Sequence, residues 1–158
     1  MSTTCIHKQP NAKHCFVCGT DNHNGLQMSF YDDNHETVAS TVTIDDRFQG
    51  YPGIVHGGIL ATVLDEAVGR VAMIGDHHHF MMTVKLTAQY RHPVPLNTEL
   101  KVEGKIIKLR GRLGKAQGEI ILPDGTVACD AELTLANMPD EMASESRLND
   151  LGWELIPD

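Results

Sequence analysis

A short apolar stretch, GIVHGGILATVLDEAVG, holds the residues best suited to chemistry. In it, Gly57 and Gly58 follow His56 and open an apolar run that contains the carboxylates Asp65 and Glu66. Glycines at a helix start expose backbone N–H groups, and the helix dipole helps such groups to hold an oxyanion. A carboxylate inside an apolar helix is costly unless it has a partner or a task. The combination indicates acyl-group chemistry, as binding or as hydrolysis.

The spacing of these groups predicts how a site is assembled. Asp65 lies eight residues after Gly57, which is roughly 12 Å along a helix. One thioester carbon cannot lie beside both groups within one chain. If both groups act on the same bond, they come from different chains, which predicts a site shared across a two-fold dimer.

Periodicity predicts the elements that position these groups. The apolar pattern predicts one long helix over Gly58–Ile74, apolar nearly all round and therefore typical of a buried helix. Alternating and β-branched segments predict six strands over Leu26–Tyr31, Thr37–Ile44, Met81–Tyr90, Glu99–Leu109, Gly114–Leu122 and Thr126–Ala136. Short turns join the strands that follow the helix. The predicted fold class is therefore α+β, an antiparallel sheet of about six strands wrapped around one long buried helix.

Length and charge narrow the class of protein. The 158 residues suffice for one domain with a core, and the net charge of -8 at pH 7 argues against nucleic-acid binding. No apolar run has the length of a membrane span, and the polar start lacks the apolar region of a secretory signal. We expect a cytoplasmic protein without membrane insertion. We divide it into an irregular N-terminal lead-in (1–25), a main domain (26–138) and a C-terminal tail (139–158).

The cysteines and histidines raise the question of a metal. Cys15 and Cys18 form a C-x2-C pair, and further potential ligands lie close by in the sequence, at Cys5, His7, His14 and His23. No second pair follows at zinc-finger spacing, so we expect reduced thiols that pack the N-terminal segment, with no metal and no other cofactor. The histidines at 77–79 are expected in an exposed loop, because adjacent side chains point in different directions.

Several motifs resemble those of the hotdog-fold acyl-CoA thioesterases, in the branch that includes the phenylacetate-pathway and THEM-type enzymes. The resemblance extends from about Cys15 to Met138. The motifs that carry it are CFVCG with the later NGL, then GIVHGG, DEA and TVKLTAQYRHP.

The resemblance implies a mechanism and an assembly. It implies hydrolysis of a fatty or aryl acyl-CoA to the acid and coenzyme A by a homodimer or a dimer of dimers, with no cofactor. Asp65 matches the catalytic carboxylate, which acts as a general base or as a nucleophile. Gly57 and Gly58 match the oxyanion position, with Gly57 the better match for the N–H donor. His56 matches the residue before it, and Thr83 matches a residue that places the attacking water.

Other residues of the predicted site are less closely matched. Some relatives carry Asn where this chain has Gly50, and the adjacent Gln49 is a candidate to supply an amide to the substrate. Arg110 and Arg112, beside a predicted turn, are candidates to bind the coenzyme A phosphates. Neighbouring residues on a helix point about 100° apart, so only one of the adjacent carboxylates can face the site. The motif favours Asp65.

Two other functions stay open. A hotdog dehydratase or hydratase acting on 3-hydroxyacyl thioesters needs a catalytic histidine, and His56 at the helix start supplies the residue type. A non-catalytic acyl-CoA sensor or binding protein would use the same fold without turnover. A panel of acyl-CoA thioesters, followed by thiol release, separates these alternatives.

Overall fold

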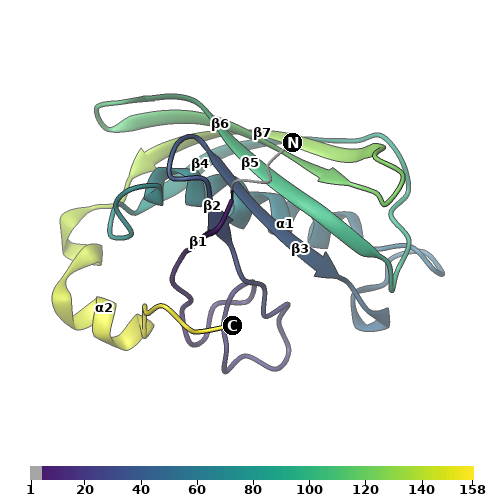
Figure 1. Ribbon diagram of the computed structural model, residues 1–158, viewed down its shortest axis with the longest axis horizontal. Helices are drawn as coiled ribbons and strands as arrows, with labels where there is room; N and C mark the ends of the chain where they lie inside the picture. Colours follow the sequence, from purple (N-terminus) through teal and green to yellow (C-terminus); the bar gives the residue numbers. More distant parts are fainter. Residues whose placement is uncertain (1–4) are drawn as a thin grey trace.

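A single antiparallel sheet forms most of the computed structural model, which describes residues 5–158 (Figure 1). The sheet has seven strands in the order β1-β2-β3-β5-β6-β7-β4. Every pair of neighbouring strands is antiparallel. The strands are β1 (His7–Lys8), β2 (Tyr31–Asp32), β3 (Thr37–Thr43), β4 (Met81–Tyr90), β5 (Glu99–Arg110), β6 (Leu113–Ile121) and β7 (Val127–Asn137). β4 lies at one edge of the sheet, although it precedes β5 in the chain.

One helix, α1 (Gly57–Gly69), packs against the inner face of this sheet (Figure 1). Its core-facing side chains recur at helical spacing and are at most 3% exposed: Leu60, Val63, Leu64, Ala67 and Val68. The predicted α+β architecture, an antiparallel sheet wrapped around one long helix, is confirmed. The helix is shorter than predicted, because a 3-10 turn follows it at Arg70–Met73.

Two facing glycines let the sheet approach the helix closely. Gly104 of β5 pairs with Gly118 of β6. A Cβ atom at Gly104 would lie 2.8 Å from the backbone oxygen of Ala67, and one at Gly118 would lie 2.4 Å from Val68 Cγ2. A larger residue at either position would push α1 off the sheet. The pair therefore fixes the distance between the helix and the sheet.

The prediction of a strand over Leu26–Tyr31 is wrong for most of its length, because β2 contains only Tyr31 and Asp32. Gln27 has a left-handed φ of 50°. The Leu26 and Met28 N–H groups donate to Phe16 and Val17 instead of to a neighbouring strand. Met28 and Phe30 are nevertheless buried. The alternation of apolar and polar residues therefore predicts correctly which side chains face the core, although the backbone is not a strand.

The N-terminal segment is irregular, as expected, but tightly packed. Residues 1–4 of the predicted lead-in lie outside the described residues. From residue 9 onward the segment supplies buried side chains, among them Gln9, Asn11, Val17 and Cys18. Asn11 forms an antiparallel bridge with Glu154, so the N-terminal segment around Asn11 and the C-terminal tail lie side by side below the sheet (Figure 1).

The C-terminal tail folds back onto the end of α1. It contains a 3-10 turn at Asp140–Ala143 and a short helix, α2 (Glu145–Leu151). Trp153 Nε1 donates a hydrogen bond of 2.8 Å to the backbone oxygen of His77, and its ring packs against Phe80. Among the described residues, no helix combines the length and the apolarity that crossing a membrane requires.

Candidate functional site

The start of α1 presents one free backbone donor. His56 is the N-cap residue, and its Nδ1 accepts a hydrogen bond of 2.9 Å from the Gly58 N–H. Within residues 5–158, the Gly57 N–H has no hydrogen-bond partner, whereas the Gly57 carbonyl accepts a bond of 2.9 Å from Tyr90 Oη. An oxyanion at this helix start would therefore be met by the N–H of Gly57, because that of Gly58 is already used.

Crowding around His56 explains the glycines at positions 58 and 50. A Cβ atom at Gly58 would lie 3.1 Å from His56 Nδ1, within the capping hydrogen bond. A Cβ atom at Gly50 would lie 3.0 Å from His56 Cα, so an asparagine there would displace the histidine. Gln49 lies in the same loop, and its Oε1 accepts a bond of 3.0 Å from the Gly53 N–H. Its exposed amide nitrogen remains available to a ligand.

The predicted catalytic carboxylate lies further along the helix, on its exposed side. Asp65 Oδ1 accepts a hydrogen bond of 2.6 Å from Thr83 Oγ1 of β4. The two residues line a shallow pocket of about 300 Å³. Its other walls include three flexible apolar side chains, those of Met73, Met81 and Met82. The structure thus brings Asp65 and Thr83 together beside an apolar surface.

The neighbouring carboxylate is directed elsewhere. Glu66 Oε1 accepts a hydrogen bond of 2.9 Å from Arg70 Nε, and Glu66 Oε2 lies 3.9 Å from Cys15 Sγ. Arg70 is buried, with only 2% of its side chain exposed. Glu66 is therefore held in an ion pair with a buried arginine, although it also lines the pocket beside Asp65. Asp65 is left to face the outside.

The two candidate phosphate ligands lie at the Thr83 end of the molecule. Arg110 and Arg112 flank the tip of the β5–β6 hairpin, and both are exposed. The register places this tip level with the start of β4, because Leu113 pairs with Ala136 and Ala136 pairs with Met82. Within one chain, the structure does not bring these arginines to the Gly57 end of the helix.

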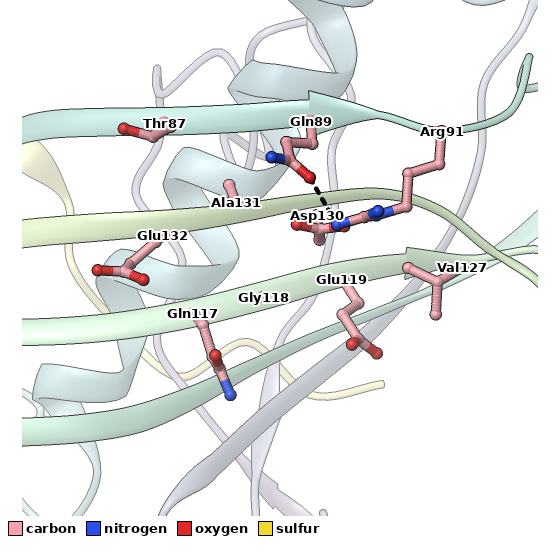
Figure 2. A pocket seen from close by; sticks show the side chains of 10 residues that line it. All are labelled: Thr87, Gln89, Arg91, Gln117, Gly118, Glu119, Val127, Asp130, Ala131 and Glu132. Atoms are coloured by element: carbon pink, nitrogen blue, oxygen red, sulfur yellow. Dashed lines mark hydrogen bonds and ion pairs between the residues drawn. The ribbon is translucent and has the colours of Figure 1, made fainter.

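A larger hollow, of about 570 Å³, lies on the outer face of the sheet and is lined by polar side chains of β4, β6 and β7 (Figure 2). Arg91 pairs there with Asp130 and with Gln89. Glu119 and Gln117 lie on the opposite wall. This hollow lies on the face of the sheet opposite to α1 and its free N–H group, and the one cation among its lining residues is already paired. It offers no catalytic arrangement.

Two features of this region were missed by reasoning from the sequence. Tyr90 anchors the helix start, and only its place at the end of a predicted strand hinted at that role. The second feature is a cluster in which the side-chain atoms of Cys15, Cys18 and Glu66 lie within 4.8 Å of one another. A hydrogen bond with Cys18 lowers the pKa of Cys15 to about 7, and the same bond, with burial, raises the pKa of Cys18. The other predicted ligand candidates are absent from this cluster.

Comparisons with known proteins show which family this region of the chain resembles. The family described as Thioesterase superfamily matches residues 52–129, which include the helix start, Asp65 and Thr83. Acyl-coenzyme A thioesterase THEM4 of Rattus norvegicus is 36% identical over 66 residues, which cover 42% of this chain and 27% of that protein. The chain therefore aligns with only about a quarter of that relative.

Solved structures extend the likeness over more of the chain. A thioesterase superfamily protein of known structure is 31% identical, with a TM-score of 0.72, over 78% of this chain and 60% of that one. The smu.793 protein of Streptococcus mutans, solved with acetyl CoA, shares the fold at 19% identity and a TM-score of 0.60, over 65% of this chain and 81% of that one. The matched family model and the shared hotdog architecture identify residues 52–129 as a thioesterase superfamily domain.

Proposed function

We propose that the protein hydrolyses acyl-CoA thioesters to the free acid and coenzyme A, in a site shared by two copies of the chain. The observation that carries this proposal is the presence, on one helix, of a free Gly57 N–H and an exposed Asp65 held by Thr83. The name of the rat relative, an acyl-coenzyme A thioesterase, and the acetyl CoA in the smu.793 structure support this substrate class.

The edge strand β4 supports a homodimer. It is the last strand of the sheet, so one row of its backbone N–H and C=O groups faces outward. Three of its apolar side chains are strongly exposed, with values of 41% for Met82, 61% for Val84 and 54% for Tyr90. A long, exposed, apolar edge is a template for strand pairing. Pairing with β4 of a second copy would cover it and continue the sheet.

The register of this strand pairing determines which residues of the two chains lie close together in the site. Asp65 is joined to Thr83 near the start of β4, and Gly57 is joined to Tyr90 at its end. A two-fold axis through the middle of β4 sets Thr83 of one chain opposite Tyr90 of the partner subunit. Each Asp65 then lies beside the partner subunit's Gly57. This arrangement removes the separation of roughly 12 Å that one helix imposes.

The proposed reaction uses both groups at once. The partner subunit's Gly57 donates its N–H to the thioester oxygen, where negative charge develops. Asp65, oriented by Thr83, removes a proton from water as the water oxygen bonds to the carbonyl carbon. The carbon–sulfur bond then breaks, and coenzyme A leaves as a thiolate that takes up a proton. If Asp65 itself attacks, an anhydride forms as coenzyme A leaves, and water then opens it at the Asp65 carboxyl carbon; a first turnover in ¹⁸O-water would leave both oxygens of the acid unlabelled, whereas direct attack by water labels one of them.

The surroundings suggest how the substrate lies. The methionines beside Asp65 form a deformable apolar wall that suits a fatty or an aryl chain. Arg110 and Arg112, at the same end of the sheet, are placed to attract phosphates of coenzyme A. The four cysteines, all within the described residues, form no disulfide, which favours a reducing, cytoplasmic setting. Thiol release from thioesters of graded chain length measures the preference, and light scattering distinguishes a dimer from a dimer of dimers.

Complementation tests the shared site. Gly57→Pro removes only the donor, because proline suits the first helical position and His56 already has the extended ψ of 133° that proline requires before it. Homodimers of Gly57→Pro and of Asp65→Asn should each be nearly inactive. A mixed dimer contains one site with both groups and one with neither, so it should recover about half of the wild-type activity.

Gly57→Ala is the matched control, because it keeps the N–H and its Cβ atom would lie 3.4 Å from Tyr90 Cε1. This variant should retain most activity. If verified mixed dimers stay as inactive as their parents, one chain supplies both groups and the shared site is wrong. If the wild type binds acyl-CoA but releases no thiol from any thioester, the protein is a binding module.

A further inference from the structure

Three potential metal ligands converge from two distant parts of the chain. Cys15 and Cys18 belong to the N-terminal segment, whereas Glu66 belongs to α1. Their sulfur and oxygen atoms lie within 4.8 Å of one another, and they are the described residues that form such a group. Glu66 lines the same pocket as Asp65, but its oxygens face Arg70 and Cys15, whereas Asp65 bonds to Thr83. The hydrolysis proposed above does not use it.

The loop around the cysteines is shaped to hold negatively charged sulfur. Cys15 Sγ accepts backbone N–H groups from Val17 at 3.3 Å and from Cys18 at 3.4 Å. Cys18 Sγ accepts the N–H of Ala12 at 3.4 Å. Neutral thiols are weak acceptors, so three inward-pointing donors suit thiolates better than thiols. The next residue must be Gly19, because a Cβ atom there would lie 2.2 Å from the Cys15 carbonyl oxygen.

One separation between the ligand atoms is close to that expected around a tetrahedral ion. Bonds of about 2.3 Å from zinc to sulfur and about 2.1 Å from zinc to oxygen place tetrahedral ligand atoms roughly 3.6–3.8 Å apart. The distance from Cys15 Sγ to Glu66 Oε2 is 3.9 Å. That separation is long for a hydrogen bond from a thiol but close to what a shared ion requires.

The arginine that hydrogen-bonds to Glu66 is also placed as such a site requires. Arg70 Nε donates to Glu66 Oε1 at 2.9 Å and so leaves Oε2 free to bind an ion. The Arg70 Nη1 donates to the backbone oxygen of Pro10 at 2.9 Å, which fixes the guanidinium against the N-terminal segment. Two thiolates and one carboxylate carry three negative charges. A divalent cation and Arg70 supply three positive charges, so the buried group is neutral.

We propose that Cys15, Cys18 and Glu66 bind a divalent zinc-type ion that ties the N-terminal segment to α1. Water fills the fourth position, for which the side chain of Glu66, 23% exposed, leaves access. The ion would stabilise a segment that has little regular structure of its own. This reverses the expectation from spacing, because the third ligand lies on a helix far along the chain and not in a second cysteine pair.

Metal content and cobalt spectroscopy test the proposal. The chain is prepared without a histidine tag, kept reduced with a phosphine, and examined by elemental analysis and by titration with Zn²⁺ or Co²⁺. We expect one zinc per chain and, with cobalt, sulfur-to-metal charge-transfer absorption. Cys15→Ser combined with Cys18→Ser should lose both signals, whereas Cys5→Ser, which removes a thiol outside the cluster, should keep them.

The adjacent carboxylates provide a second matched pair. Glu66→Gln should weaken zinc binding by more than the roughly 10- to 100-fold that loss of a residue bonded to a ligand costs, because a direct ligand is lost, whereas Asp65→Asn should leave zinc binding unchanged. Chelation should lower the Tm of the wild type and not that of the double serine variant. If the wild type shows no cobalt–sulfur absorption, or if the double serine variant binds zinc as tightly, the site does not exist. The wild-type spectrum decides the matter even if the serine variants fail to fold.

Discussion

Replacing each of two adjacent carboxylates by its amide should separate catalysis from stability. Asp65→Asn keeps an oxygen that can accept the Thr83 hydroxyl, and the side chain is exposed, so we expect a stability change within about 0.5 kcal/mol. Loss of the general base should lower kcat by about 10²–10⁴-fold, or roughly 3–5 kcal/mol of activation free energy.

Glu66→Gln should have the opposite effect. It removes the charge that pairs with Arg70, which is 2% exposed. Breaking a buried ion pair costs about 3–5 kcal/mol. Here the loss should be smaller, about 2 kcal/mol, because Arg70 keeps its bond to Pro10 and its stacking on Phe30 and Trp153. At roughly 2–4 °C per kcal/mol for a chain of this size, the Tm should fall by roughly 4–8 °C.

Two measurements decide between these outcomes. Thiol release from a good acyl-CoA substrate gives kcat, and urea unfolding gives the free energy of unfolding, both at a temperature where each variant is folded. Unfolding is repeated with chelator and with added zinc, so that loss of the ion is not counted as loss of the ion pair. Full activity in Asp65→Asn together with an inactive, stable Glu66→Gln would exchange the two roles and refute the assignment.

Three further substitutions test parts of the framework. His56→Ala should destabilise the protein by about 1 kcal/mol, because the Gly58 N–H loses its acceptor, and His56→Asn should restore most of that loss in urea unfolding. Trp153→Ala should cost about 2 kcal/mol through lost ring contacts, whereas Trp153→Phe should lose only the bond to His77, about 1 kcal/mol. The Asp33 carboxylate accepts three backbone N–H groups, which lower its pKa although burial raises it. Its contribution to stability is therefore present above the unfolded-state pKa and disappears as the pH falls through the lower folded-state value. Asp33→Ala should flatten the loss of stability measured by urea unfolding from about pH 5 to pH 2.

The elements that were predicted well are those with a clear period and clear ends. The strands β5, β6 and β7 were expected within a few residues, because their alternation is regular and glycine-containing turns separate them. The helix start at Gly57 was expected one residue later. Its end was misplaced, because the apolar pattern continues through the 3-10 turn at Arg70–Met73 and does not distinguish the two kinds of helix.

The segment before β2 shows why the rest was not predictable. The residues from Leu26 to Phe30 alternate like a strand, yet the N–H groups of Leu26 and Met28 donate to the carbonyl groups of Phe16 and Val17. A pattern of burial says which side chains face the core, but not which backbone supplies the hydrogen bonds. The same limit hid the cluster around Cys15, since the Glu66 carboxylate reaches it only after the chain has folded.

The candidate site illustrates the reverse case, in which local rules were sufficient. The distance between Gly57 and Asp65 follows from helix geometry alone, and so does the angle of about 100° between Asp65 and Glu66. The distance predicts that Gly57 and Asp65 of one chain cannot both lie beside the same thioester carbon. The angle predicts different surroundings for the two carboxylates, and the structure shows one bonded to Thr83 on the exposed side and the other paired with Arg70.

These two rules together account for a helix that is apolar nearly all round and still carries two adjacent charges. The face with Leu60, Val63 and Leu64 is buried by the sheet of its own chain. The face with Asp65 has no such cover in one chain, which is expected if a second copy completes it. The side with Glu66 meets the N-terminal segment, where the carboxylate is satisfied by Arg70 and lies beside two sulfur atoms. The three sides of α1 would thus serve packing against the sheet, catalysis and contact with the N-terminal segment. The effect of a substitution in α1 should therefore depend on which of these sides carries the substituted residue.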